Sequence, residues 1–265
     1  MSLAPSITHV VLELGLGESL VGAGDGDALA PLGTPQVGRY LSVDLEKLLV
    51  LAPTHVLAQT GEAKLPRRVS DLARSGRFAL ADLEYPADPD AAVALIRAIG
   101  RELGRDQAAD RLADGVAARL GDIAALTAPR PAPRALLVFS TDPLRVSGPG
   151  SVNDRLLRIA GGENAASAYR VSAPVLDREA LRASAPEVVF LMEPGGAPWA
   201  GPDDPRRGPF EGLALPALRD GRVVVLNDPA VLLPGPSMAA TAASMAEALH
   251  PDLDVAIAEV FRDRP

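Results

Sequence analysis

The 265-residue sequence contains no cysteine, which excludes disulfide bonds, thiolate metal sites and a cysteine nucleophile. Aromatic residues make up only 3% of the chain, so alanine, leucine and valine must supply most of the 48% hydrophobic content. No apolar run approaches the roughly 18–20 residues that a membrane-spanning helix requires. These absences leave a globular protein with an aliphatic core as the expected class.

Positive charge is also scarce, since acidic side chains exceed basic ones and the net charge is −8. A binder of nucleic acid or of anionic membranes needs a basic face, so we expect neither partner. The three histidines, His9, His55 and His250, lack the spacing of a metal site, and we expect no metal. The first residues show no signal-peptide pattern, so we expect either a cytoplasmic protein or a targeting segment outside this sequence.

One motif occurs twice, 133 residues apart, in residues 44–57 and 177–190. Both copies follow the pattern D-x-E-x-L-x3-A-P-x2-V without a gap, and a weaker similarity extends upstream of each copy. The repeat predicts two similar lobes that arose by duplication, each with one glutamate, Glu46 or Glu179, at an equivalent place. Two matched acids indicate a partner that contacts both lobes.

Helical and strand patterns alternate along the whole chain, which is typical of the α/β class with mainly parallel sheets. The longest periodic helix covers residues 106–126 and would measure roughly 30 Å, enough to cross between two lobes. We therefore expect an N-terminal lobe over residues 1–104, a bridging helix over 105–128 and a C-terminal lobe over 129–265. The other predicted helices are 6–17, 43–51, 66–75, one that begins at residue 88 or 90 and runs to 103, 152–160 and 237–249. The predicted strands are 20–22, 55–58, 78–80, 135–139, 188–192 and 223–226.

Several segments resemble one known family. Residues 4–22 resemble the opening SLAPS-T-E-LGLG--LVG of the cobalamin, haem and ferric-siderophore substrate-binding proteins of ABC importers. Residues 45–53 are similar to that family's LE-ILALKPDLV segment, and residues 148–151 and 160–164 are similar to its GPGS and AGGEN segments. The matches occur in order over nearly the whole chain, so they point to the family but leave the ligand open.

The resemblance implies two Rossmann-like lobes joined by one long helix, as in a class III periplasmic binding protein, with the ligand between the lobes. It implies a monomeric, periplasmic or otherwise extracytoplasmic protein that captures a cobalamin-like corrinoid or another tetrapyrrole, such as haem, for a membrane permease dimer. A ferric siderophore is the alternative ligand. A two-domain α/β enzyme is a further alternative, but the sequence lacks the required cysteine or glycine fingerprint, so we expect no catalysis and no intrinsic cofactor.

By the same resemblance, the repeated acids dock the permease, and the role carries over to Glu46 in the first copy and Glu179 in the second. Arginine–carboxylate pairs set the orientation and the specificity of such contacts. An acid in the first turn of a helix also stabilises the helix dipole, by about 0.3–1 kcal/mol, and the two roles are compatible. The symmetric placement favours docking, because only a two-sided partner explains it.

The expected ligand contacts lie in loops that line the cleft of relatives. Tyr40 could stack on a tetrapyrrole or ligate iron through its phenolate, and Arg39 beside it could pair with a carboxylate. Gln59 follows a predicted strand, at the end where ligands bind in α/β sheets. The other candidates are Trp199 in a Pro- and Gly-rich loop over residues 193–208, Asp228 after the last strand, and Tyr169 upstream of Glu179. Ordinary packing within a lobe is the competing explanation for each of them.

Overall fold

The computed structural model describes residues 1–39, 42–61 and 64–262. The chain forms two compact units, and the boundary between them falls inside the longest helix, α5 (Asp106–Thr127), after Asp114. Unit 1 comprises Met1–Pro86, Asp90–Asp114 and Leu233–Pro236, and unit 2 comprises Ala87–Pro89, Gly115–Leu232 and Ser237–Pro265.

Unit 1 is built on a small parallel sheet. β3 (His55–Ala58) and β4 (Ala79–Asp82) pair along their whole length, and Ser2 adds single parallel bridges to Leu57 and to Ala23. Its other elements are α1 (Pro5–Glu13), the 3-10 helix η1 (Gly17–Ser19), the antiparallel pair β1 (Gly38–Arg39) and β2 (Ser42–Val43), α2 (Leu45–Leu51), α3 (Arg67–Arg74), and α4 (Pro89–Glu102) apart from its first residue.

Apolar residues at helical and strand periodicity form the core of unit 1. Leu48 of α2 and Val69 of α3 pack in one buried cluster with Val56 of β3, so these two helices cover the same face of the sheet. α4 and the start of α5 lie close together because Gly100 has no side chain; a Cβ at this position would lie 2.1 Å from that of Ala109.

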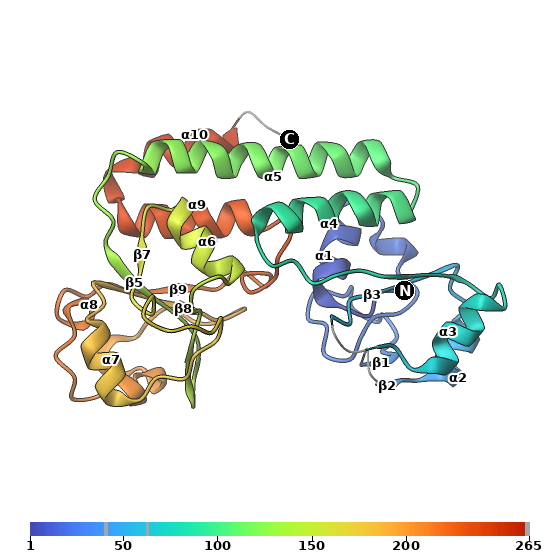
Figure 1. Cartoon of the computed structure of the whole chain (residues 1–265), viewed down its shortest axis with the longest axis horizontal. Coiled ribbons are helices and arrows are strands. Elements are labelled where there is room, and N and C mark those ends of the chain that lie inside the picture. Colours follow the sequence, from blue (N-terminus) through green and yellow to red (C-terminus); the bar gives the residue numbers. More distant parts are fainter. Residues whose placement is uncertain (40–41, 62–63, 263–265) are drawn as a thin grey trace. The chain divides into compact units, whose positions relative to one another are not determined.

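Unit 2 contains the larger sheet, whose strands run in the order β6-β5-β8-β9 with β7 also paired to β5. Figure 1 labels β5, β7, β8 and β9 of this sheet. β5, β7, β8 and β9 are parallel, and β6 returns antiparallel to β5 after the cis peptide bond between Asp142 and Pro143. The strands are β5 (Arg134–Thr141), β6 (Leu144–Val146), β7 (Glu163–Asn164), β8 (Val188–Met192) and β9 (Val223–Leu226).

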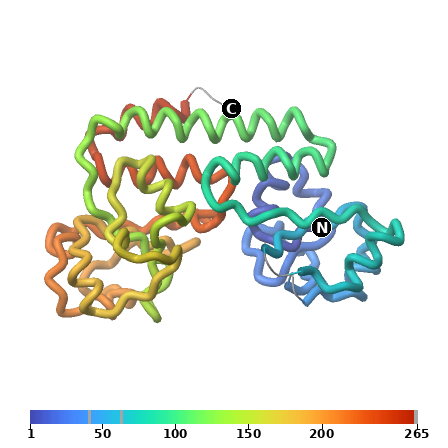
Figure 2. The backbone as a smooth tube through the Cα atoms, viewed as in Figure 1, coloured from blue at the N-terminus to red at the C-terminus, as the bar shows by residue number. Residues whose placement is uncertain are grey.

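Helices cover both faces of this sheet, which explains why all five residues of β8 are buried. Leu136, Val189 and Leu191 point to one face and cluster with Leu181 of α7 and Ala217 of α8. α6 and α9 contact each other and the sheet, and α10 packs beside α5, where Arg119 lies 5.3 Å from the Phe261 ring (Figure 2). The helices of unit 2 are α6 (Val152–Ile159), α7 (Arg178–Ser184), the 3-10 helices η2 (Gly201–Asp203) and η3 (Pro205–Phe210), α8 (Pro216–Arg219), α9 (Met238–Leu249), η4 (Pro251–Leu253) and α10 (Asp254–Arg262).

The α/β class with parallel sheets is confirmed, and β3, β8 and β9 have their predicted bounds. Two local predictions are wrong. The first helix ends at Glu13 rather than at residue 17, because Gly15 adopts a left-handed φ of 71°. Residues 20–22 form no strand, since the adjoining Ala23 makes only single bridges, to Ser2 and Gln36, and no ladder develops. Among the helices in the described part of the chain, none is both long and apolar enough to cross a membrane.

Candidate functional site

The two copies of the repeated motif form the same local structure. Asp44 and Asp177 cap α2 and α7, each accepting a hydrogen bond from the backbone N–H three residues on, at 3.1 and 2.8 Å. Both helices have seven residues, and both end at an alanine in the left-handed region, Ala52 with φ 42° and Ala185 with φ 40°. A proline follows each alanine and stops the helix.

Glu46 and Glu179 are both exposed in the first turn of their helices. No ion pair joins either carboxylate to a basic side chain in the described ranges, and Lys47 lies 3.6 Å from Asp44 instead. Each acid is therefore free to accept hydrogen bonds from an external arginine or lysine. Beside α7, a hollow of about 640 Å³ has Arg178 and the three prolines Pro143, Pro205 and Pro209 in its wall.

Unit 1 has a hollow of about 360 Å³ at the carboxyl end of β3, between Pro5, Gln59, Tyr85 and Leu233. Gln59 is buried, and its amide is held in place: Oε1 accepts from Ser6 Oγ at 2.6 Å and Nε2 donates to the Glu84 carbonyl at 3.1 Å. The predicted contact residue thus lines the hollow with a fixed orientation, and its hydrogen-bonding groups are already engaged.

Sequence reasoning missed Tyr85, whose side chain lines the same hollow and remains 57% exposed. Burial raises the pKa of the Tyr85 phenol above its ordinary value, so the ring carries a neutral hydroxyl at physiological pH. Such a ring offers an apolar face and a hydrogen-bond donor rather than a phenolate. The pattern that could have identified it is an aromatic residue shortly after β4, on the same edge of the sheet as Gln59.

In unit 2, Trp199 lies in the loop after β8 and packs half-buried against the core of that unit. The guanidinium carbon of Arg206 lies 5.8 Å from the centre of its ring, within the range of a cation–π contact. Arg206 also donates to Glu193 and Asp204, each at 2.5 Å, and to the carbonyl oxygens of Ala197 and Pro198. Arg206 therefore cross-links the loop over residues 193–208, whose only regular structure is two 3-10 helices.

Asp204 is the buried partner in this network, with only 1% of its side chain exposed. The side chain of Arg206, followed by the backbone N–H groups of Ala200 and Arg206, holds the pKa of Asp204 well below its usual range despite burial. Asp204 raises the pKa of Arg206 in turn. The pair is ionised at neutral pH, and we expect the loop that carries Trp199 to be preorganised.

Three further residues were predicted to contact the ligand. Tyr169 is half-buried against the core of unit 2, where its backbone N–H donates to the Ala166 carbonyl at 3.1 Å. Arg39 is exposed at the end of β1 in unit 1. Tyr40 lies outside the described residues.

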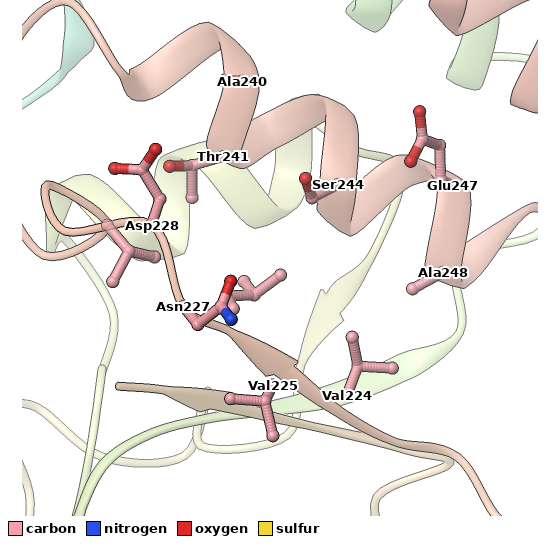
Figure 3. A pocket seen from close by; sticks show the side chains of 11 residues that line it. Val224, Val225, Asn227, Asp228, Ala240, Thr241, Ser244, Glu247 and Ala248 are labelled. Carbon is pink, nitrogen blue, oxygen red and sulfur yellow. The ribbon is translucent and has the colours of Figure 1, made fainter. Parts of the chain in front are cut away.

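Asp228 lines a third hollow, of about 470 Å³, between the end of β9 and one face of α9 (Figure 3). Its Oδ1 accepts from the backbone N–H of Ala230 at 2.7 Å, which fixes the carboxylate at the mouth of the loop. Thr241 and Ser244 present hydroxyl groups on the wall formed by α9, and the Thr241 hydroxyl lies on the side of Asp228. In the part of the chain that the structure describes, no group of three or more metal-ligating side chains comes together.

The model of the family described as "Periplasmic binding protein" matches residues 1–230. The chain is 25% identical over 199 residues to a vitamin B12-binding protein of Photorhabdus laumondii, covering 72% of this chain and 69% of that relative. A vitamin B12-binding protein of Pectobacterium atrosepticum is 26% identical over 209 residues, covering 74% and 71% of the two chains.

Several solved structures of periplasmic binding proteins are similar to this chain. The periplasmic heme-binding protein RhuT of Roseiflexus sp. RS-1 has a TM-score of 0.75 and 26% identity, over 94% of this chain and 97% of that one. The periplasmic heme-binding protein BhuT, solved with two hemes, has a TM-score of 0.76 and 26% identity over 95% and 97%. The heme-binding protein HutB of Vibrio cholerae has a TM-score of 0.81 but 22% identity, over 94% and 98%, and shows the shared fold.

Proposed function

This chain belongs to the periplasmic binding protein family, and from that membership we propose that it is the substrate-binding component of an ABC importer and that its ligand is a tetrapyrrole, either haem or a cobalamin-like corrinoid. The observation that carries the ligand class is the similarity, at 25–26% identity, to proteins named for vitamin B12 and for heme. The function is binding and delivery rather than catalysis.

The side chains available in each unit suit a large, flat ligand. In unit 1, Tyr85 leaves much of its ring exposed over an apolar hollow, and in unit 2, Arg206 holds Trp199 by a cation–π contact. Aromatic rings of this kind stack on macrocycles with little loss of entropy when they are already fixed. The residues that we propose to contact the ligand are Arg39, Tyr40, Gln59, Tyr85, Tyr169 and Trp199.

The ligand class is tested by titrating the protein separately with haemin, cyanocobalamin and a ferric hydroxamate siderophore. We expect one tetrapyrrole to quench Trp199 fluorescence and to saturate at low micromolar concentration or below, and the siderophore to have no effect. Trp199→Ala and Tyr85→Ala should each weaken binding by about tenfold, read by ligand absorbance, as expected for loss of a stacked ring. Saturation by the siderophore alone would replace this proposal with the siderophore alternative.

We further propose that Glu46 and Glu179 dock the membrane permease. Both are exposed, both occupy the first turn of an Asp-capped helix, and the duplicated motif supplies one to each unit. The permease would provide one arginine or lysine for each acid. The partner would therefore recognise the two units as a pair.

The docking proposal is tested with the double variant Glu46→Ala/Glu179→Ala in a reconstituted importer. We expect uptake to fall by at least about tenfold, since each acid contributes a charge-assisted contact, while ligand affinity changes less than about twofold. The matched control is Glu102→Ala/Glu211→Ala, which also removes one exposed acid from each unit and should transport normally. A loss of ligand affinity in the first variant would assign these acids to the ligand site instead.

A further inference from the structure

The hollow beside Asp228 is built from two elements of unit 2. Val224 and Val225 of β9 form an apolar floor, and the loop after the strand brings Asp228 to one end (Figure 3). The wall is one face of α9, where Thr241, Ser244 and Glu247 follow one another at intervals of three residues. With a volume of about 470 Å³, the hollow falls within the size range of small-molecule sites.

Thr241 is the most informative group in this wall. The residue is only 5% exposed, and its hydroxyl forms no hydrogen bond to another described residue. The hydroxyl is directed toward the side of the hollow where the Asp228 carboxylate lies (Figure 3). The hydroxyl opens onto the hollow, so a ligand bound there can supply its hydrogen-bond partner.

The other polar groups of the hollow also offer acceptors. Asp228 accepts from the backbone N–H of Ala230 through Oδ1, so its Oδ2 is available to a ligand. Asn227 donates its side-chain N–H to the Gly196 carbonyl at 3.1 Å, so its side-chain oxygen is also available as an acceptor. The side chains of Ser244 and Glu247 form no hydrogen bond to another described residue. The carboxylates and the Asn227 oxygen can only accept, and the two hydroxyls can accept as well, so a molecule rich in donors fits these positions.

The charge of the hollow has one sign. Two carboxylates line it, and no lysine or arginine is among the lining residues. Arg222, directly before β9, donates instead to the carbonyl oxygens of Ala248 and Leu249 at 2.9 and 3.5 Å. Burial, and then the charge of Asp254, raise the pKa of Glu247, which is what an acid without a neutralising partner shows. The hollow would repel the carboxylates of a haem.

We propose that this hollow is a second, independent binding site and that it takes an aliphatic diamine. One ammonium group would donate to Asp228 Oδ2 and Thr241 Oγ1, the methylene chain would cover Val224 and Val225, and the second ammonium group would approach Glu247. Six residues of helix separate Thr241 from Glu247, a rise of about 9 Å, which suits a chain of several methylenes. This reading moves Asp228 from the tetrapyrrole site to a site of its own.

The experiment is isothermal titration calorimetry at low ionic strength, where charge attraction is least screened. The probes are hexamethylenediamine, hexylamine with one ammonium group, and hexanediol with none. We expect the diamine to bind at least about tenfold more tightly than hexylamine, and hexanediol to give no saturable heat. Equal binding of hexanediol and the diamine would overturn the proposal, because the site would then recognise only the apolar chain.

Three variants test the assignment of the residues. Asp228→Asn and Thr241→Val should each weaken the diamine by about tenfold or more, and Glu247→Gln should reduce its affinity to that of hexylamine without changing hexylamine itself. Glu211→Gln, an exposed acid elsewhere in unit 2, is the control and should change nothing. Unchanged diamine binding in both Asp228→Asn and Thr241→Val would refute the site.

The diamine site can be tested independently of the tetrapyrrole site. Protein saturated with haem or with cyanocobalamin should bind the diamine with unaltered affinity, since the proposed contact residues are different. A protein that binds the diamine but no tetrapyrrole would support this inference while contradicting the proposed function. Competition between the two ligands would show that the hollow is part of the tetrapyrrole site, and would contradict the inference.

Discussion

Replacing Asp204 by asparagine should lower the free energy of unfolding of unit 2 by about 2–3 kcal/mol at neutral pH. The carboxylate accepts from Arg206 N and Nε through Oδ1, at 2.9 and 2.7 Å. Through Oδ2 it accepts from Ala200 N at 2.9 Å and from Arg206 Nη2 at 2.5 Å. Asparagine keeps one acceptor oxygen, so it loses the second pair of bonds.

The magnitude follows from those two bonds. A hydrogen bond that involves a charged group contributes about 1.5–3 kcal/mol, so two would sum to roughly 3–6 kcal/mol. Arg206 would still reach Glu193, which is 47% exposed, and the Pro198 carbonyl. Because these partners and the solvent at Glu193 still stabilise the Arg206 charge, the expected loss falls to about 2–3 kcal/mol.

The assay is urea unfolding followed by the fluorescence of Trp199, which is the only tryptophan and therefore reports on unit 2. The pKa of Asp204 is depressed in the folded state, so its stabilisation is complete above its unfolded value of about 3.8 and is lost as the pH falls below it. The difference between the wild type and Asp204→Asn should thus be about 1 kcal/mol smaller at pH 3 than at pH 6.

Two results would refute this reasoning. A loss below about 0.5 kcal/mol at neutral pH would mean that the buried pair contributes no more than a surface pair. A difference that stays constant between pH 6 and pH 3 would mean that the lost group is not a carboxylate with a depressed pKa. Asp220→Asn is the control, because Asp220 pairs with Arg219 on the surface, and we expect no measurable change.

Two further predictions concern the local structure of unit 2. Ala185→Gly should leave the free energy of unfolding unchanged or raise it by up to about 1 kcal/mol, because glycine tolerates the left-handed φ of 40°. The control, Ala180→Gly inside α7, should lower it by roughly 0.5–1 kcal/mol, and a loss at both positions would contradict the strain at Ala185. Asn164→Ala should cost about 3 kcal/mol, since this buried side chain donates to the Ser147 carbonyl and to Asp154 and accepts from Ala166 N. Urea unfolding measures both, and a cost below about 1 kcal/mol for Asn164→Ala would mean that water replaces these bonds.

Several parts of the fold could be predicted because they depend on neighbours in sequence. β8 and β9 are short aliphatic runs between turn residues, and their bounds agree with the structure. α5 shows apolar residues at helical spacing over its whole length and spans one residue more than predicted. The repeated motif predicted two similar lobes, and both copies form a seven-residue helix with an aspartate cap and a left-handed alanine, although the first helix begins at Leu45 rather than at residue 43.

Other features depend on residues that are far apart or on backbone geometry. The short strands β6 and β7 carry too few residues to show a period, and they form only because β5 offers them an edge. In the sequence Arg206 stands only beside another arginine, yet in the structure it joins Glu193, 13 residues away, to the buried Asp204. Tyr85 became a candidate only when the fold placed it beside Gln59 and Leu233.

By itself, the sequence determined the α/β class, the duplication and the two acids at equivalent helix starts, because hydrophobic period, capping residues and proline act over a few neighbouring residues. Only the tertiary structure decided which polar groups are already paired. Gln59 and Arg206 are engaged within their own units, whereas the Thr241 hydroxyl and one oxygen of Asp228 have no bond to any other described residue. Burial and hydrogen bonding join residues that are distant in the chain, so no local pattern reports them.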